Sequence, residues 1–351
     1  MILWVRNPWA KWPILTLAAG AVLYCVAWVG TAALLSNQID AWVGRQREAG
    51  TTIAYGDPLI GGFPGRVVIS LPGWDVSRPA EEGGWSWRTA AVRVHAAPWR
   101  PLAFTVDVAG RHTVGGPWAL PGATAWISLT RADITPALLA DGSLRSIDIA
   151  LAEGALAETS GAPPLATLSD ARLTVAPQPN ETEPAWAISA TIAGLRVPDT
   201  LELGPFATEL RTLNLDARLI GPIAPGPIAE SLDAWRRGGG TLDIRTLVLD
   251  WPPLGMEGSA TLALDERLQP IGAGSIKFKG FFDAVDRMAE DELVKPATAS
   301  MARIVLGLMA RDAPDGSGPE LSVAVTLQDG KLNAGPLPLM DVPPVDWGGL
   351  R

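Results

Sequence analysis

The chain has little of the residue types on which most catalytic and metal centres depend. It contains one cysteine, Cys25, and two histidines, His95 and His112, among 351 residues. A single cysteine rules out an intramolecular disulfide and a zinc site built from several cysteines. No Asp, Glu or Cys pattern beside either histidine completes a metal-ligand set, so the sequence predicts no metal ion.

Familiar catalytic motifs are also missing from the sequence. It has no HExxH, no GxSxG and no glycine loop of the kind that holds phosphates. The carboxylates clustered between Asp283 and Glu292 suit a helix N-terminus and a solvated face better than acid–base chemistry. We therefore expect a protein that is not an enzyme, with no catalytic residue and no cofactor.

Blocks of basic residues are absent as well. The chain has 28 Lys and Arg against 37 Asp and Glu, so its formal charge is 28 − 37 = −9. Contacts to phosphates need clustered Lys and Arg. We therefore expect that nucleic acid is not a partner of this protein.

One long hydrophobic stretch is present at the N-terminus. Residues Trp12 to Leu35 include no charged side chain, and about 20 such residues suffice to cross a bilayer as a helix. Arg6 and Lys11 precede the stretch and make residues 1–11 the cytoplasmic side. We expect residues 12–35 to be a transmembrane anchor in a bacterial inner membrane, with the residues that follow it in the periplasm. The residues taken to represent this anchor are Trp12, Leu17, Leu23, Trp28 and Leu35.

A cleavable signal peptide is the alternative for this segment. Its apolar region would be shorter, about 7–15 residues, and would end in an Ala-x-Ala-like site. Thr31-Ala32-Ala33 is a weak match to such a site. Residues 36–50 continue at helical spacing and predict a stalk helix that ends at Gly50.

Beyond the stalk, residues 51–351 alternate between apolar and polar side chains. This period of two, interrupted by Gly, Pro and Asp turns, predicts antiparallel strands. The strands are expected at Val92–Ala96, Phe104–Val108, Ser146–Leu151, Arg172–Ala176, Trp186–Ile192, Leu213–Leu219, Leu242–Leu249, Ala260–Leu264, Ser275–Phe278 and Leu321–Leu327.

Three segments of this region have helical spacing instead. Thr135–Ala140 predicts one helical turn, and Ile228–Arg237 predicts a helix. Phe281–Arg311 is the longest, and Pro296 should divide it into two helices, because proline disrupts a helix interior.

The expected fold is mainly β, with one transmembrane helix followed by a large curved antiparallel sheet capped by helices. The apolar side of such a sheet must be covered. It would close on itself as a sandwich or half-barrel, pack against the helices, or form a groove around an apolar ligand such as lipid.

Two further features are candidates for a function or for packing. The turn at Gly62, Phe63, Pro64 and Arg66 reads either as a functional loop or, as we favour, as a structural turn in which Phe63 fills the core and Arg66 pairs with a carboxylate. The chain also holds 15 Trp, several of them in its first half, which would line a lipid or sugar surface or, more simply, fill the core.

Several segments in the same order resemble a bacterial envelope family catalogued as domain of unknown function 2125. They include Gly62-Phe-Pro-Gly-Arg-Val67, Trp99-Arg-Pro-Leu102, Trp251-Pro-Pro-Leu254, Leu268-Gln-Pro270, Asp329-Gly-Lys-Leu332 and Gly335-Pro-Leu-Pro-Leu339. The ending loosely resembles the AsmA-like envelope proteins, some of which are implicated in lipid transport. This resemblance implies a protein that binds or guides lipid or other apolar molecules; the alternative is a non-enzymatic scaffold or interaction module for envelope assembly, with other envelope proteins as partners.

Overall fold

A computed structural model gives the fold of the chain. It describes residues 11–78, 84–116, 124–139, 144–178, 184–199, 206–224, 226, 228–313, 316, 318–335, 337–345 and 347, with the side chains of residues 11–14 and 337–339 outside the description. The sequence predictions for residues 1–10, and the side chain of Trp12, lie outside these described parts.

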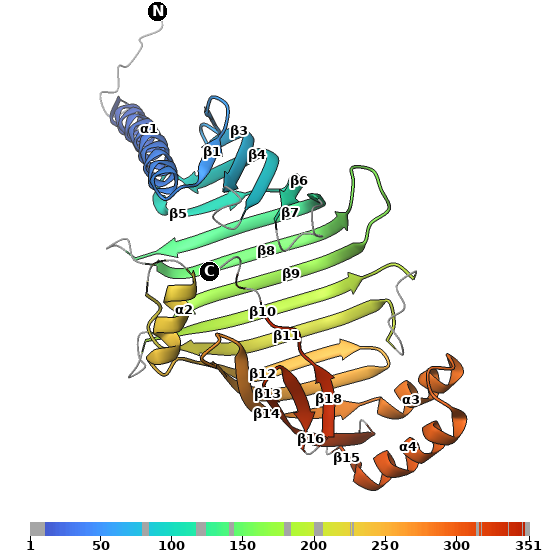
Figure 1. Cartoon of the computed structure of the whole chain (residues 1–351). Coiled ribbons are helices and arrows are strands. Elements are labelled where there is room, and N and C mark those ends of the chain that lie inside the picture. The colour runs from blue at the N-terminus through green and yellow to red at the C-terminus, as the bar shows by residue number, and fades with distance from the viewer. Residues whose placement is uncertain are drawn as a thin grey trace, which may run out of the picture.

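The structure is a long helix followed by a single antiparallel sheet (Figure 1). The helices are α1 (Lys11–Glu48), α2 (Ile228–Arg237), α3 (Phe281–Glu290) and α4 (Pro296–Met309). The strands are β1 (Thr52–Ala54), β2 (Leu59–Gly61), β3 (Val67–Arg78), β4 (Trp85–Ala97), β5 (Arg100–Asp107), β6 (Gly110–Gly115), β7 (Thr124–Leu138), β8 (Leu144–Ala157), β9 (Ala166–Pro177), β10 (Ala185–Arg196), β11 (Glu209–Ile220), β12 (Thr241–Trp251), β13 (Leu254–Leu264), β14 (Pro270–Lys279), β15 (Arg311–Asp312), β16 (Pro319–Gln328), β17 (Lys331–Ala334) and β18 (Leu337–Asp341).

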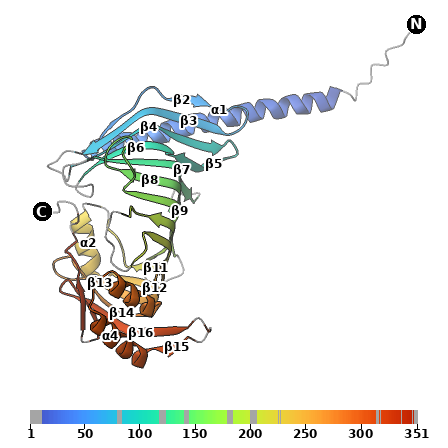
Figure 2. The same cartoon turned by 90° about the vertical axis from the view of Figure 1, so that its right-hand side faces the viewer.

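From β7 onward the sheet is a meander in which each long strand pairs with the next. The register is regular from β8 to β11, and irregularities interrupt it between β7 and β8, between β11 and β12 and between β12 and β13. Seen along its strands, the sheet is bent into an open arc, with α2 and the end of the chain on the hollow side (Figure 2). This confirms the prediction of a large antiparallel sheet.

Every strand predicted from alternation lies within a strand of the structure, except that Val108 follows the end of β5. The helical turn predicted at Thr135–Ala140 is wrong. Thr135 to Leu138 form the end of β7 and pair with β8, and Ala137 also pairs with Ala103 of β5. Pairing on both sides outweighs the weak local helical preference of a short segment. Ala140 itself lies outside the described residues.

The predicted helices of the second half are confirmed. Helix α2 has the bounds predicted from the sequence. The stretch after Phe281 is divided into α3 and α4, with Pro296 in the first turn of α4, where its missing amide costs no hydrogen bond. Arg311, the expected end of this helical stretch, belongs to β15 instead.

The predicted anchor and stalk form one unbroken helix, α1. It ends at Glu48, and Gly50 follows with a φ of 86°, the left-handed conformation that commonly terminates helices. From Thr31 onward α1 packs on the first strands, with Val43 1% exposed against Ile69 and Leu71 of β3. Leu35, one of the residues taken to represent the anchor, is 4% exposed and part of this core, so the last turn of the predicted anchor packs on the sheet.

Candidate functional site

The main candidate site is one face of the sheet, which carries apolar side chains from strand to strand. Directly paired residues in neighbouring strands share a face. One such row crosses nine strands: Ala132, Leu151, Ala171, Ile192, Leu213, Leu249, Met256, Phe278 and Leu321. A parallel row two residues away holds Ile134, Ile149, Leu173, Ala190, Leu215, Leu247, Gly258, Ile276 and Val323.

Hydrogen bonding and chirality place these rows on the hollow side of the arc. The amide of Gln178 donates to the carbonyl of Ala185 in β10, so the main-chain groups of Leu173 and Val175, at odd positions of β9, point to β8. For an L-residue, this direction and the strand direction decide the side on which the side chain lies. In Figure 1, β9 and β11 both run to the left, and β8 lies above β9. With their main-chain groups pointing up toward β8, Leu173 and Val175 must carry their side chains toward the viewer. The apolar rows therefore face the viewer of Figure 1. That is the hollow side in Figure 2.

The opposite, outer face of the sheet is polar, and charged side chains on it form ion pairs. It carries Arg131–Asp133 at 2.7 Å and Arg218–Asp243 at 3.4 Å, and the hydroxyl of Thr174 donates to Asp148 across β9 and β8 at 2.8 Å. The arc therefore has a hydrated outer surface and an apolar inner surface.

The inner surface is only partly covered by the described residues. Beneath α1, the inward side chains of β3 are closed off, with Val67, Ile69 and Leu71 exposed by 0%, 1% and 2%. Farther along the arc, Leu151, Ile192 and most of their row keep intermediate exposure. In the described parts of the chain the extensive helix–strand contacts are those of α1 with β1, β3 and β5 and of α3 with β13. Strands β7 to β12 thus present an apolar face that, in the described parts of the chain, only α2 approaches, at one end of the strands (Figure 1).

At the α1 end, the predicted turn at Gly62 to Arg66 lies against the helix. The Phe63 ring meets Trp28 edge to face at 5.6 Å, and the Tyr24 hydroxyl donates to the carbonyls of Pro64 and, at 3.1 Å, Gly65. The structural reading of this turn is corrected in two respects. Phe63 does not fill the core, because 57% of it is exposed, and among the described residues Arg66 has no carboxylate partner. The glycine is structural, since φ of Gly62 is 93° and a Cβ there would lie 2.2 Å from the Arg66 carbonyl oxygen.

An aromatic cluster lies beside the end of α1. The Trp74 indole stacks on Tyr55 at 5.5 Å and on Trp42 at 6.5 Å, and it meets Trp87 edge-on at 6.3 Å. A pocket of about 320 Å³ is lined by these tryptophans together with Trp85, Gln46, Thr51, Ile53, Val76 and Arg78. The core-packing interpretation of the tryptophans therefore holds for Trp74, which is 5% exposed, whereas Trp99 is 67% exposed.

Titratable side chains show no convergent arrangement within the described residues. No group of three His, Cys, Asp or Glu is placed to hold a metal ion in those parts. His112 is buried, and its Nδ1 accepts a hydrogen bond from the Trp87 indole at 3.3 Å. Burial lowers the pKa of His112 below its ordinary value.

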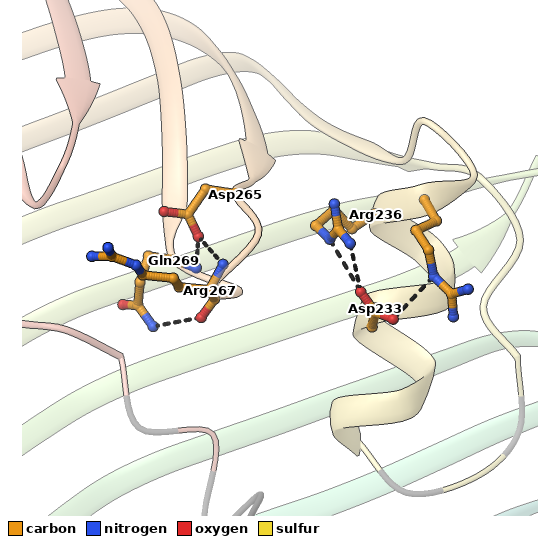
Figure 3. Close-up of polar contacts among 6 residues, drawn as sticks. Asp233, Arg236, Asp265, Arg267 and Gln269 are labelled. Carbon is orange, nitrogen blue, oxygen red and sulfur yellow. Dashed lines mark hydrogen bonds and ion pairs between the residues drawn. The ribbon is translucent and has the colours of Figure 1, made fainter.

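Carboxylates with clear contacts hold local structure together. Asp233 of α2 binds Arg236 and Arg237, and these contacts, led by the hydrogen bond from Arg236, lower the pKa of Asp233 (Figure 3). In the turn between β13 and β14, Asp265 accepts the amides of Arg267 and Gln269 (Figure 3).

The predicted carboxylate cluster of α3 also has a packing role. Asp286 forms an ion pair with Arg303 of α4, which joins the two helices. The sequence predicted a helix N-terminus and a solvated face for these carboxylates, and it did not predict this ion pair.

Sequence reasoning missed the contact between the hydrophobic N-terminal stretch and the sheet. Tyr24, Trp28, Thr31 and Leu35 recur at spacings of four, three and four, and this stripe of one helix face was the available signal. Leu17 and Leu23, in contrast, are 77% and 70% exposed.

Comparison with known proteins gives one match. The model of a family described as "Uncharacterized protein conserved in bacteria (DUF2125)" matches residues 28–343. No curated protein and no solved structure matches the chain, so the looser resemblance to AsmA-like proteins stays a prediction.

Proposed function

Because this chain belongs to the bacterial DUF2125 family, which brings no known activity with it, we propose a function from its geometry: an envelope protein that binds or guides lipid or other apolar molecules along the hollow face of its sheet. It is anchored in the inner membrane by α1, with residues 1–11 in the cytoplasm and the sheet in the periplasm. It is not an enzyme and uses no cofactor.

The observation that carries this proposal is the pair of apolar rows from β7 to β16 on the concave side of the arc. An apolar surface of this extent is unfavourable in water, and in soluble proteins large apolar patches mark binding surfaces. Its length, many strands across, suits extended acyl chains better than a compact polar ligand, because it offers area without convergent hydrogen-bonding groups.

The anchor rests on the length and composition of α1. It is the one helix in the described chain that is long and apolar enough to cross a membrane. Retention of the segment, as opposed to cleavage near Ala33, is supported by the side chains before that point that contact the sheet. The Thr31 hydroxyl donates to the Pro98 carbonyl at 3.0 Å, and Trp28 packs on Phe63.

Lipid content of the purified protein tests this function. The full-length protein is extracted in detergent, exchanged into lipid-free detergent, and offered a bacterial lipid extract before mass spectrometry of what it retains. Two neighbouring substitutions form a matched pair. Ile192→Asp puts a carboxylate on the apolar row, whereas Thr191→Asp puts it on the outer face, directly opposite Arg172.

We expect Ile192→Asp to lower lipid retention several-fold and Thr191→Asp to leave it unchanged, since a carboxylate among acyl chains is costly. Wild-type protein that neither retains nor takes up lipid would overturn the proposal. Equal retention in all three proteins would remove the sheet face as the binding surface.

A second candidate function, a scaffold in envelope assembly, is favoured by the surface of α4. Met301, Ile304, Val305 and Leu308 recur at helical spacing and are exposed by 62%, 61%, 47% and 83%. Crosslinking in intact cells, compared between wild type and Leu308→Asp, tests it. A defined partner lost only in the variant would support the scaffold, and an unchanged crosslinking pattern would count against it.

A further inference from the structure

Two turns of the sheet carry exposed apolar side chains beside the hydrophobic part of α1. Leu59, Ile60 and Phe63 belong to β2 and the turn after it, and Trp99 and Leu102 to the turn and strand after β4. Their exposed fractions are 63%, 52%, 57%, 67% and 45%. The two turns adjoin because Val67, at the start of β3, pairs with Ala96, at the end of β4. We call these five residues the apolar tip.

The apolar tip is fixed to α1 within the uncharged stretch of the helix. Tyr24 binds the Pro64 and Gly65 carbonyls, Trp28 packs on Phe63, and Thr31 binds the Pro98 carbonyl. Figure 2 shows α1 leaving the body of the protein past β2 and β5. The position of the apolar tip relative to a membrane is therefore set by the position of residues 24–31 of the helix.

Helix length decides where they lie. Lys11 is charged, so the hydrocarbon part of a span begins near Trp12. From Trp12 to Tyr24 the helix rises about 18 Å, at 1.5 Å per residue. The hydrocarbon core of a bilayer is about 30 Å thick. About 12 Å of the core therefore remains beyond Tyr24, and any tilt of the helix increases this length. Residues 24–31 rise about 10.5 Å, so they lie within the core.

We propose that the apolar tip inserts into the distal leaflet of the membrane that α1 crosses, so that the sheet begins inside the lipid. This inference rests on the proposed anchoring by α1 and adds a second, independent membrane contact. The occupant of the tip is the lipid bilayer itself, because the surface is continuous with the span.

The charges around the tip fit an interfacial position. Arg66 and Arg100 are exposed at the two turns, where a long basic side chain can extend to lipid phosphates while its stem stays in apolar surroundings. Asp57 precedes β2, at the end of that strand away from the turn. No charged residue lies between Asp57 and Arg66, so no carboxylate enters the lipid with the turn.

Depth-dependent fluorescence quenching tests the insertion. The full-length protein is reconstituted in phosphatidylcholine–phosphatidylglycerol vesicles with or without nitroxide-labelled acyl chains, and one cysteine is labelled with a polarity-sensitive dye. Native Cys25, exposed on α1, reports the anchor. Ile60→Cys in a Cys25→Ala background reports the tip, and Leu308→Cys in the same background is an exposed apolar control on α4.

We expect the dye at position 60 to be blue-shifted and quenched by the lipid nitroxides several-fold more than the dye at 308, and to be protected from aqueous iodide. Quenching at Cys25 together with an iodide-accessible, unquenched dye at 60 would overturn the insertion while leaving the anchor intact. An unquenched dye at Cys25 would remove the anchor itself, and the inference with it. A dye at 60 that is shielded only in native membranes, and not in pure lipid vesicles, would assign the tip to a protein partner and likewise refute the proposal.

Discussion

The packing of α1 on the sheet makes two adjacent leucines differ sharply in their contribution to stability. Leu35 is 4% exposed and belongs to the core formed with β3, whereas Leu34, about 100° further around the helix, is 38% exposed. Replacing a buried leucine by alanine removes its transfer free energy and leaves a cavity, at a cost of about 2–5 kcal/mol. In detergent, Leu34 faces alkyl chains in folded and unfolded protein alike, so Leu34→Ala should cost below about 1 kcal/mol.

Thermal unfolding of the full-length protein in mild detergent, followed by tryptophan fluorescence, measures both changes. At about 2 °C per kcal/mol for a chain of this size, Leu35→Ala should lower Tm by roughly 4–10 °C and Leu34→Ala by less than about 2 °C. Equal shifts in the two variants would refute the packing of α1 on the sheet. The same result would be obtained if the segment were cleaved, and the mass of the purified chain separates these two cases.

Two further predictions concern the first part of the sheet. Gly62→Ala should destabilise the protein by roughly 2 kcal/mol, because φ of 93° is strained for alanine and its Cβ would meet the Arg66 carbonyl. Gly61→Ala, with no atom near its Cβ, should be neutral in the same unfolding assay. Similar values for the two variants would contradict the role of Gly62. Burial holds the pKa of His112 below that of the unfolded chain, so protons bind the unfolded state first as pH falls below about 6.5 and stability declines. Urea unfolding at pH 7.5 and 5.5 should show a smaller loss in His112→Gln than in wild type, and an equal loss would exclude His112 as a source of the acid sensitivity.

The regular part of the fold was accessible from the sequence because alternation is a local signal. Trp186 to Ile192 alternates strictly, and it lies in β10 with its apolar residues on one face. The division of the late helical stretch at Pro296 follows equally directly from the chemistry of proline. These features depend on neighbours in the chain, so the local order of residues is enough to predict them.

Features that depend on distant partners were not accessible. Leu35 reads as one more apolar residue of a membrane span, because the stripe that it forms with Tyr24, Trp28 and Thr31 does not say which strand, some thirty residues later, will cover it. Phe63 reads as a core residue for the same reason, since its contact with Trp28 exists only once the helix and the turn are both in place. Whether the sheet closes around a filled core or stays open as a groove also depends on its curvature. That curvature follows from twist and register irregularities summed over many strands.

The two faces of the arc impose one requirement on whatever the protein does. The outer face is solvated through pairs such as Arg218–Asp243, so it needs no partner. The inner face has none of this compensation along rows such as Ile192, Leu213 and Leu249, and an uncovered apolar surface of that extent favours self-association. A chain that keeps the face open must therefore keep it near lipid or next to another apolar surface. Fixing the sheet to α1 within the uncharged stretch meets that requirement at one end, because the first strands are held beside the membrane from which acyl chains would come.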